Sequence, residues 1–161
     1  MPPEEHRLPP LTPSEEATVR ALAQVMMELP HLVDADMVRD AQIPLSEYTT
    51  LMHLSEAPER HMRMSELAAA CSLSLSGMTR VVSRLEKQGL VQRAKCSNDG
   101  RGWNAVLTDS GLARLKAAWP THLASVRRHI ITPLAGHDLA QPTAALQAIA
   151  TTPAPTTRAH T

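Results

Sequence analysis

The sequence has few aromatic residues and few cysteines. Its 161 residues include two Trp, one Tyr, no Phe and two Cys. The low aromatic content argues against a surface that binds nucleic acid by stacking bases on aromatic rings. Two cysteines are too few for a disulfide-stabilised scaffold, and Cys71 and Cys96 are too far apart in the chain for a CxxC metal or redox pair.

Long apolar runs, metal-ligand spacings and catalytic motifs are also missing. No run approaches the roughly 18 apolar residues that span a bilayer, and the N-terminal MPPEEHRLPP does not have the pattern of a signal peptide. We therefore expect a cytoplasmic protein without a membrane partner. No two of the eight His are three or four residues apart, and no HExxH, GxSxG or Walker A motif occurs. These absences predict no metal, no cofactor and no catalytic residue, and therefore a protein that is not an enzyme.

The charge is strongly segregated along the chain, although the net charge is zero. Residues 1–59 carry three Arg against eleven acidic residues, whereas residues 60–103 carry eight Lys or Arg against three acidic residues. A phosphate backbone responds to the local field and not to the total charge of the chain. The basic middle segment is therefore compatible with binding to duplex nucleic acid.

The two ends and the first helix are marked by their composition. Residues 1–11 and 151–161 are rich in Pro or Thr and lack periodicity, so we expect flexible termini. Thr12, Pro13 and Glu15 form a capping box, which predicts a helix over residues 12–41. Pro30 lies inside this range and predicts a kink or break near Leu29.

The segment 62–89 has the pattern of a helix-turn-helix. A short helix is expected from Ser65, as its N-cap, and a second helix from Ser74, with Gly89 as its left-handed C-terminal stop. One face of the second helix, residues 75–88, is apolar, whereas its other face carries small hydrogen-bonding side chains and cations. Those polar positions are Ser76, Gly77, Thr79, Arg80, Ser83, Arg84 and Lys87. Such a face is modest enough in size to enter a DNA major groove.

A β-hairpin is expected after Gly89. A turn signal, Ser97 to Gly100, separates two short β-prone stretches and places Arg101 near the hairpin tip. An Arg held there can enter a narrow minor groove, and the carboxylate of Asp99 can orient its guanidinium.

Residues 62–111 resemble the winged helix-turn-helix of the MarR-type transcriptional regulators. The family's wing motif, D-x-R followed by Leu-Thr, is matched by Asp99, Arg101, Leu107 and Thr108, with Ala105 where the family prefers Val. The resemblance implies a mainly α fold with a small β-hairpin wing, a DNA-binding lobe over residues 42–111, and dimerisation helices over residues 12–41 and 112–150. It also implies a homodimer, a palindromic operator, and a small aromatic or phenolic effector.

The resulting interpretation is a dimeric, ligand-responsive DNA-binding regulator that acts as a repressor. The expected DNA contacts are Arg63, Ser74, Ser76, Gly77, Thr79, Arg80, Ser83, Arg84, Lys87, Arg93, Lys95, Asp99 and Arg101. Tyr48 and Trp119 are candidates for the effector pocket, with the alternative that both belong to the core. Arg20, Arg127 and Arg128 are interpreted as surface charge.

Two other interpretations of the same residues remain open. A winged helix can bind protein without binding specific DNA. Cys96 lies beside Lys95 and near other cations, which lower the pKa of a thiol, so a redox-sensing regulator is also conceivable.

Overall fold

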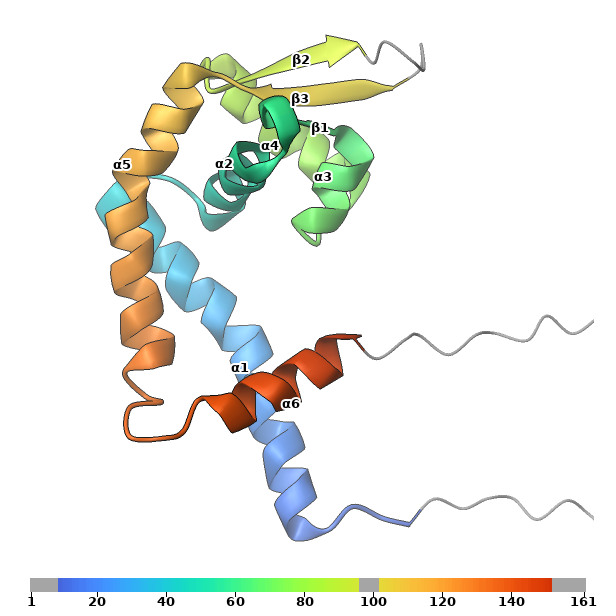
Figure 1. Ribbon diagram of the computed structural model, residues 1–161, viewed down its shortest axis with the longest axis vertical. Coiled ribbons are helices and arrows are strands. Elements are labelled where there is room, and N and C mark those ends of the chain that lie inside the picture. The colour runs from blue at the N-terminus through green and yellow to red at the C-terminus, as the bar shows by residue number, and fades with distance from the viewer. Residues whose placement is uncertain (1–8, 96–101, 152–161) are drawn as a thin grey trace, which may run out of the picture.

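The chain forms a winged lobe and a stalk of long helices (Figure 1). The computed structural model describes residues 9–95 and 102–151. The winged lobe comprises α2 (Leu45–Glu56), β1 (His61–Arg63), α3 (Met64–Ala70), α4 (Leu75–Lys87), β2 (Val91–Lys95) and β3 (Trp103–Leu107). The stalk comprises α1 (Pro13–Asp36), α5 (Asp109–Val126) and α6 (Ala140–Thr151). The predicted fold class, mainly α with a small β-wing, is confirmed.

Helix α1 begins at the predicted capping box. The backbone N–H of Glu15 donates to the Thr12 hydroxyl (3.3 Å), and the Thr12 N–H donates to the Glu15 carboxylate (2.7 Å). The predicted break near Leu29 is wrong, because α1 continues through Pro30 to Asp36 and then into a π-helical turn, Met37–Ala41. Pro30 removes a single hydrogen-bond donor, and the helical bonds on either side of it persist.

The sheet is antiparallel, with the strand order β1–β3–β2. The pairing of β2 with β3, in which Lys95 lies opposite Trp103, confirms the predicted hairpin; its turn, residues 96–101, lies outside the described residues. The prediction of a Ser65 N-cap is wrong: α3 begins at Met64, and its N-cap, Arg63, makes no side-chain capping bond. Strand β1 leads directly into this helix, so the chain direction is set by the sheet and not by a cap.

The core fills the winged lobe and reaches into the adjoining parts of the stalk, where Met37 and Ala118 are fully buried. Its largest fully buried side chains include Tyr48, Leu51, Leu54, Met78 and Leu85, so aliphatic and Met side chains replace the missing Phe. Gly111 allows α5 to start close to the lobe, since a Cβ at this position would lie 2.1 Å from the Leu90 carbonyl oxygen. The stalk is therefore attached to the lobe by a close backbone contact.

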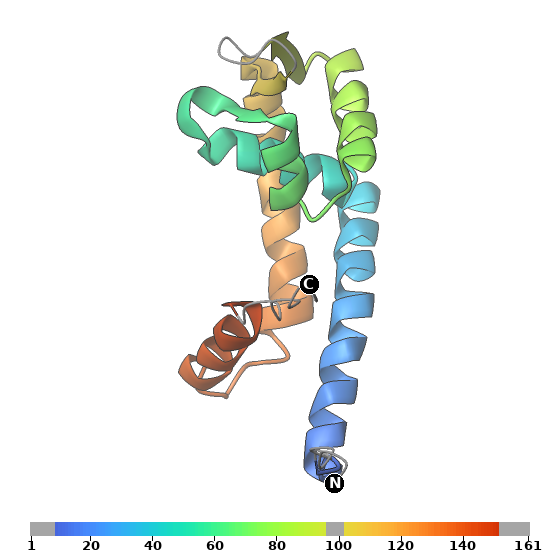
Figure 2. The same cartoon turned by 90° about the vertical axis from the view of Figure 1, so that its right-hand side faces the viewer.

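The stalk leaves much apolar surface exposed. Figures 1 and 2 show α1 and α5 extending away from the lobe, with α6 projecting from the far end of α5. Helix α6 has no buried residue, and its Leu146 and Ile149 are exposed. Over residues 9–95 and 102–151, no helix has the length and hydropathy that crossing a membrane requires.

Candidate nucleic-acid interface

Helix α4 is built as the sequence predicts. The Ser74 hydroxyl accepts a hydrogen bond from the Gly77 N–H (3.1 Å), and Gly89 ends the helix with a φ of +71°. Met78, Val81, Val82 and Leu85 are buried on one face of the helix. The side chains of the other face therefore point away from the core, on a helix that is firmly packed.

The outward face of α4 carries hydroxyls and cations. Ser76, Thr79, Arg80 and Lys87 are exposed. The Thr79 hydroxyl donates to the Leu75 carbonyl oxygen (2.8 Å), which leaves its oxygen able to accept a hydrogen bond. Within the described part of the chain, Arg80 and Lys87 have no hydrogen-bond or ion-pair partner. Both cations are thus available to an external anion.

Arg84 and Glu47 form an ion pair that joins α4 to α2. The guanidinium Nε of Arg84 donates to a carboxylate oxygen of Glu47 at 2.8 Å. Glu47 is buried, whereas the Arg84 side chain is half exposed. Arg84 is therefore held by the lobe itself, which the helical pattern alone did not indicate.

Arg93 fastens the wing to α4. Its Nη2 donates to the Thr79 carbonyl oxygen (3.1 Å) and to the Ser83 hydroxyl (2.5 Å), and its Nε lies 3.6 Å from the Glu86 carboxylate. Ser83 is only partly exposed. Two of the predicted DNA contacts, Ser83 and Arg93, thus bind each other and fix the angle between helix and hairpin.

The base of the wing carries the remaining predicted cations. Lys95 on β2 is exposed, and its Nζ lies 6.0 Å from the centroid of the Trp103 ring. Arg63 lies at the end of β1. Asp99, Arg101 and Cys96 fall outside the described residues, so the predicted Asp–Arg tip stays a prediction.

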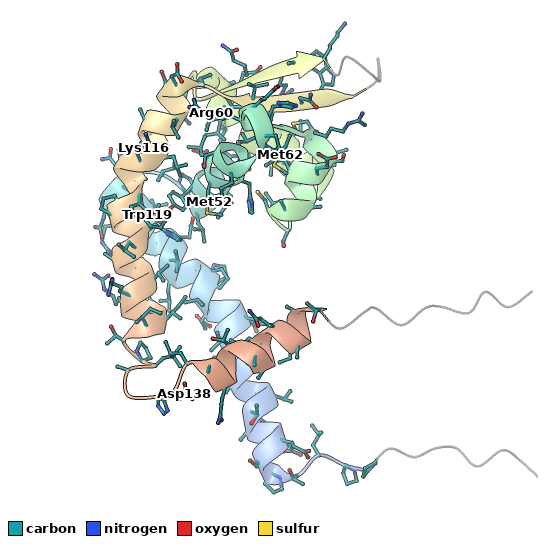
Figure 3. The ribbon with its side chains drawn as sticks, in the orientation of Figure 1. Met52, Arg60, Met62, Lys116, Trp119 and Asp138 are labelled. Carbon is teal, nitrogen blue, oxygen red and sulfur yellow. The ribbon has the colours of Figure 1, made fainter. Side chains whose placement is uncertain are left out.

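The two effector-pocket candidates lie at the junction of α2 and α5, together with a residue that the sequence reading missed. Tyr48 is fully buried, and its ring stacks on His122 with centroids 4.5 Å apart; the Trp119 ring lies 6.0 Å from the same imidazole. Trp119 projects from the middle of α5 and is half exposed (Figure 3). Burial raises the pKa of Tyr48 and lowers the pKa of His122. A lone His on a helix gives no sequence signal for such a stack.

A buried carboxylate, Asp36, joins the two long stalk helices. It accepts hydrogen bonds from the Ser125 hydroxyl (2.8 Å), from Arg39 (2.7 Å) and from Arg128 (3.2 Å), and it lies 2.9 Å from His129 Nε2. These donors, with the Ser125 hydroxyl first, hold the pKa of Asp36 well below its usual range. Arg128 is therefore an ion-pair partner and not the free surface charge that we expected, whereas Arg20 pairs with Glu16 on the exposed surface of α1.

Metal and thiol chemistry receive no support from the described residues. No group of three His, Cys, Asp or Glu side chains that could hold a metal ion occurs in residues 9–95 and 102–151. Cys71 is a free, partly buried cysteine packed against the core, and burial raises its pKa. Cys71 therefore acts as a small apolar residue at the edge of the core.

Comparisons with known proteins agree on one family. A model described as the MarR family matches residues 41–102. The solved structure of AbsC, a MarR family transcriptional regulator from Streptomyces coelicolor, is 38% identical over 89% of this chain and 96% of that chain, with a TM-score of 0.78. No curated protein sequence matches the chain significantly.

Two further structures extend this comparison. Sco3205, a MarR family transcriptional regulator from Streptomyces coelicolor solved in complex with DNA, is 32% identical over 91% of each chain, with a TM-score of 0.80. Wild-type MarR from E. coli, 21% identical over 89% of this chain and 98% of that chain with a TM-score of 0.67, shares the fold. The winged lobe, its polar helix face and these relatives together place the chain in the MarR family of transcriptional regulators.

Proposed function

We propose that this protein is a homodimeric repressor that binds a palindromic DNA operator, with α4 in the major groove and the wing in the adjacent minor groove. The observation that carries the proposal is the outward face of α4, where Ser76, Thr79 and Arg80 project from a helix anchored by a buried opposite face. Arg is suited to bidentate contact with guanine, and hydroxyls accept or donate at most base edges. Membership of a family of DNA-binding regulators, and not of enzymes, supports this assignment.

The cations divide into contact and positioning roles. Arg63, Lys87 and Lys95 supply phosphate contacts, which set the register of the protein on the duplex. Arg84 and Arg93 are first positioned by Glu47 and Ser83, and they present the remainder of their guanidinium groups to the backbone. Arg101, oriented by Asp99, belongs to the proposal as the minor-groove contact.

The second subunit is proposed from the apolar surface of the stalk. Met26 and Met27 on α1, Leu123 on α5, and Leu146 and Ile149 on α6 are all exposed. Apolar surface gathered on three helices is typical of a protein interface. A two-fold axis would set the two α4 helices about 34 Å apart, one turn of the duplex. A cytoplasmic location, where the chromosome is accessible, is part of the same proposal.

The decisive experiment is a band-shift titration with operator selected from a random DNA pool. Arg80→Ala should weaken binding by about 1 to 3 kcal/mol and relax the base preference at one position. The matched control is Lys116→Ala, which removes an exposed cation from α5 in the stalk (Figure 3) and should bind as the parent does. If the parent and Arg80→Ala have equal affinity and equal base preference, the proposal that α4 binds in the major groove is wrong.

The same titration separates the other readings. A module that binds only protein would fail to retard random-sequence duplex even at low salt. A redox-sensing regulator would lose operator affinity on treatment with peroxide, and Cys96→Ser would keep it. If peroxide leaves the affinity of both proteins unchanged, the redox reading fails.

A small aromatic or phenolic effector is the second part of the proposal. Tyr48 Oη and His122 Nδ1 are buried atoms without a hydrogen-bond partner in the described structure, in two stacked rings beside the half-exposed Trp119. Buried polar atoms without partners are rare in native proteins, and a ligand's polar group would satisfy them. A ligand that prefers one arrangement of the two lobes would change DNA affinity by its differential binding alone.

The effector proposal is tested with phenol and benzoate as probes. Release of operator by either probe should be weakened in Tyr48→Phe, which removes only the hydroxyl and keeps the stacked ring. Thermal stability of this variant should be unchanged or higher, because a buried hydroxyl without a partner is lost. If neither probe changes DNA affinity or thermal stability of the parent, these probes are not ligands of the aromatic cluster.

A further inference from the structure

Trp103 lies at the base of the wing, where the core ends. Residues 103, 105 and 107 share one face of β3, since side chains alternate along a strand. Ala105 and Leu107 on this face are buried against the helices of the lobe, but Trp103 is 48% exposed. The strand therefore carries its largest side chain past the edge of the core, on the side where α4 lies.

A hollow of about 320 Å³ lies beneath this ring. Trp103, Leu75 and Met64 form its apolar walls, and Leu75 on α4 is itself exposed. Arg63, Ser65, Thr79 and Arg93 form its polar walls. The hollow is thus bounded by three elements of the lobe: the start of α3, the first turns of α4, and the wing.

The charge around the hollow favours an anion. Arg63 and Arg93 line it, Lys95 lies beside the Trp103 ring, and no acidic side chain is among the described residues that form its walls. Thr79 belongs both to the hollow and to the outward face of α4. A duplex seated on that face would therefore pass across the mouth of the hollow.

We propose that this hollow receives one sugar–phosphate unit of the DNA backbone, with Trp103 and Leu75 packed against the deoxyribose and Arg63 near its phosphate. The inference rests on the proposed DNA-binding function and adds an apolar contact to an interface otherwise built from cations and hydroxyls. An apolar contact adds affinity without releasing counterions, so it is separable from the phosphate contacts by its salt dependence.

The two tryptophans allow a direct spectroscopic test. Trp119→Phe leaves Trp103 as the single tryptophan of the chain. Binding of this protein to the selected duplex is followed by anisotropy of a dye on the DNA, and the indole emission is read in the same titration. The emission of Trp103 should be quenched or shifted to shorter wavelength with the same midpoint as the anisotropy, because the ring loses water and contacts the DNA.

Substitutions in the Trp119→Phe background supply the energetic test. Trp103→Ala should lower affinity about tenfold at every salt concentration, with an unchanged dependence of log K on log salt. Trp103→Phe should recover most of this loss, since a flat apolar ring remains. Arg63→Ala is the matched contrast, and it should reduce the salt slope by about one. Unchanged thermal unfolding of Trp103→Ala verifies that the half-exposed ring acts on binding and not on folding.

The possible failures are distinguishable. If the parent does not bind any duplex, the proposed function fails and this inference fails with it. If the parent binds selected duplex while Trp103 emission and the affinity of Trp103→Ala stay unchanged, only this inference is overturned. If the hollow binds some other molecule and not the DNA backbone, Trp103 emission and the affinity of Trp103→Ala would likewise stay unchanged.

Discussion

The winged lobe and the stalk differ in how much of their apolar surface is exposed to solvent. Leu51, Leu54 and Leu85 of the lobe are fully buried within one chain, whereas Met27 of α1 is 69% exposed and Ile149 of α6 is 58% exposed. The lobe shares its core only with the adjoining parts of the stalk, such as Met37 and Ala118, whereas the rest of the stalk presents an apolar surface that a single chain does not cover. The comparison indicates that a single chain covers the apolar residues of the lobe, and it supports the proposal that the exposed part of the stalk packs against a second subunit.

The largest expected effect on stability comes from a substitution in the core of the lobe. Leu85→Ala removes a fully buried side chain from α4 and should lower the free energy of unfolding by about 3 kcal/mol. The matched control is Leu75→Ala, which truncates an exposed Leu of the same helix and should change stability by less than about 0.5 kcal/mol. Urea titrations measure both, and equal losses would contradict the assignment of the two faces of α4.

The second effect is at Asp36, where α1 meets α5. Asp36→Asn removes the charge that Arg39 and Arg128 neutralise, and it should cost about 2 kcal/mol at pH 7, a figure reduced by the exposure of both guanidinium groups. Because the folded-state pKa of Asp36 is lowered, its stabilisation is present above the ordinary carboxyl pKa near 4 and is lost as the pH falls further.

Urea titrations at pH 7 and pH 3 measure this linkage. The difference in stability between the parent and Asp36→Asn should be smaller at pH 3. Glu28→Gln, which alters an exposed carboxylate on the same helix, should show almost no difference at either pH. If the difference in the free energy of unfolding between the parent and Asp36→Asn is the same at both pH values, the carboxylate charge does not contribute to stability.

The third effect tests the exposed apolar surface of the stalk. Met27→Glu introduces a charge into that surface and should raise the dissociation constant of the dimer at least about tenfold, or about 1.4 kcal/mol. Met27→Leu keeps the apolar character and should leave the dimer intact. Sedimentation over a range of concentrations measures both, and a monomeric parent throughout that range would exclude the dimer.

The smallest effect is at the ion pair between α2 and α4. Glu47→Gln keeps a hydrogen-bond acceptor for Arg84 but removes the charge, so stability should fall by only about 0.5 kcal/mol, since Arg84 is half exposed. Duplex affinity at low salt should rise about two- to threefold, because the positive charge of Arg84 is no longer compensated. Band shifts read this change, and a fall in affinity would show that orientation of Arg84 by Glu47 matters more than its net charge.

Most of the lobe was predictable because its signals are local. The Ser74 cap, the Gly89 stop and the β-prone stretch that forms β3 depend on a few adjacent residues, and each appears in the structure as expected. The expectations that failed have different causes. Strand pairing of β1 sets the start of α3 at Met64, and local helical hydrogen bonds carry α1 through Pro30. The tertiary fold brings Arg128 to Asp36.

The sequence alone determined the polar face of α4, the hairpin beside it and the basic character of this segment, because helical and strand periodicity are properties of neighbouring residues. Only the tertiary structure decided which cations already have partners, such as Arg84 with Glu47 and Arg93 with Ser83. It also decided that Asp36 accepts a hydrogen bond from Ser125, which is 89 positions away in the chain. Hydrogen bonds and ion pairs act over a few ångströms, and the folded chain places residues distant in sequence within that range.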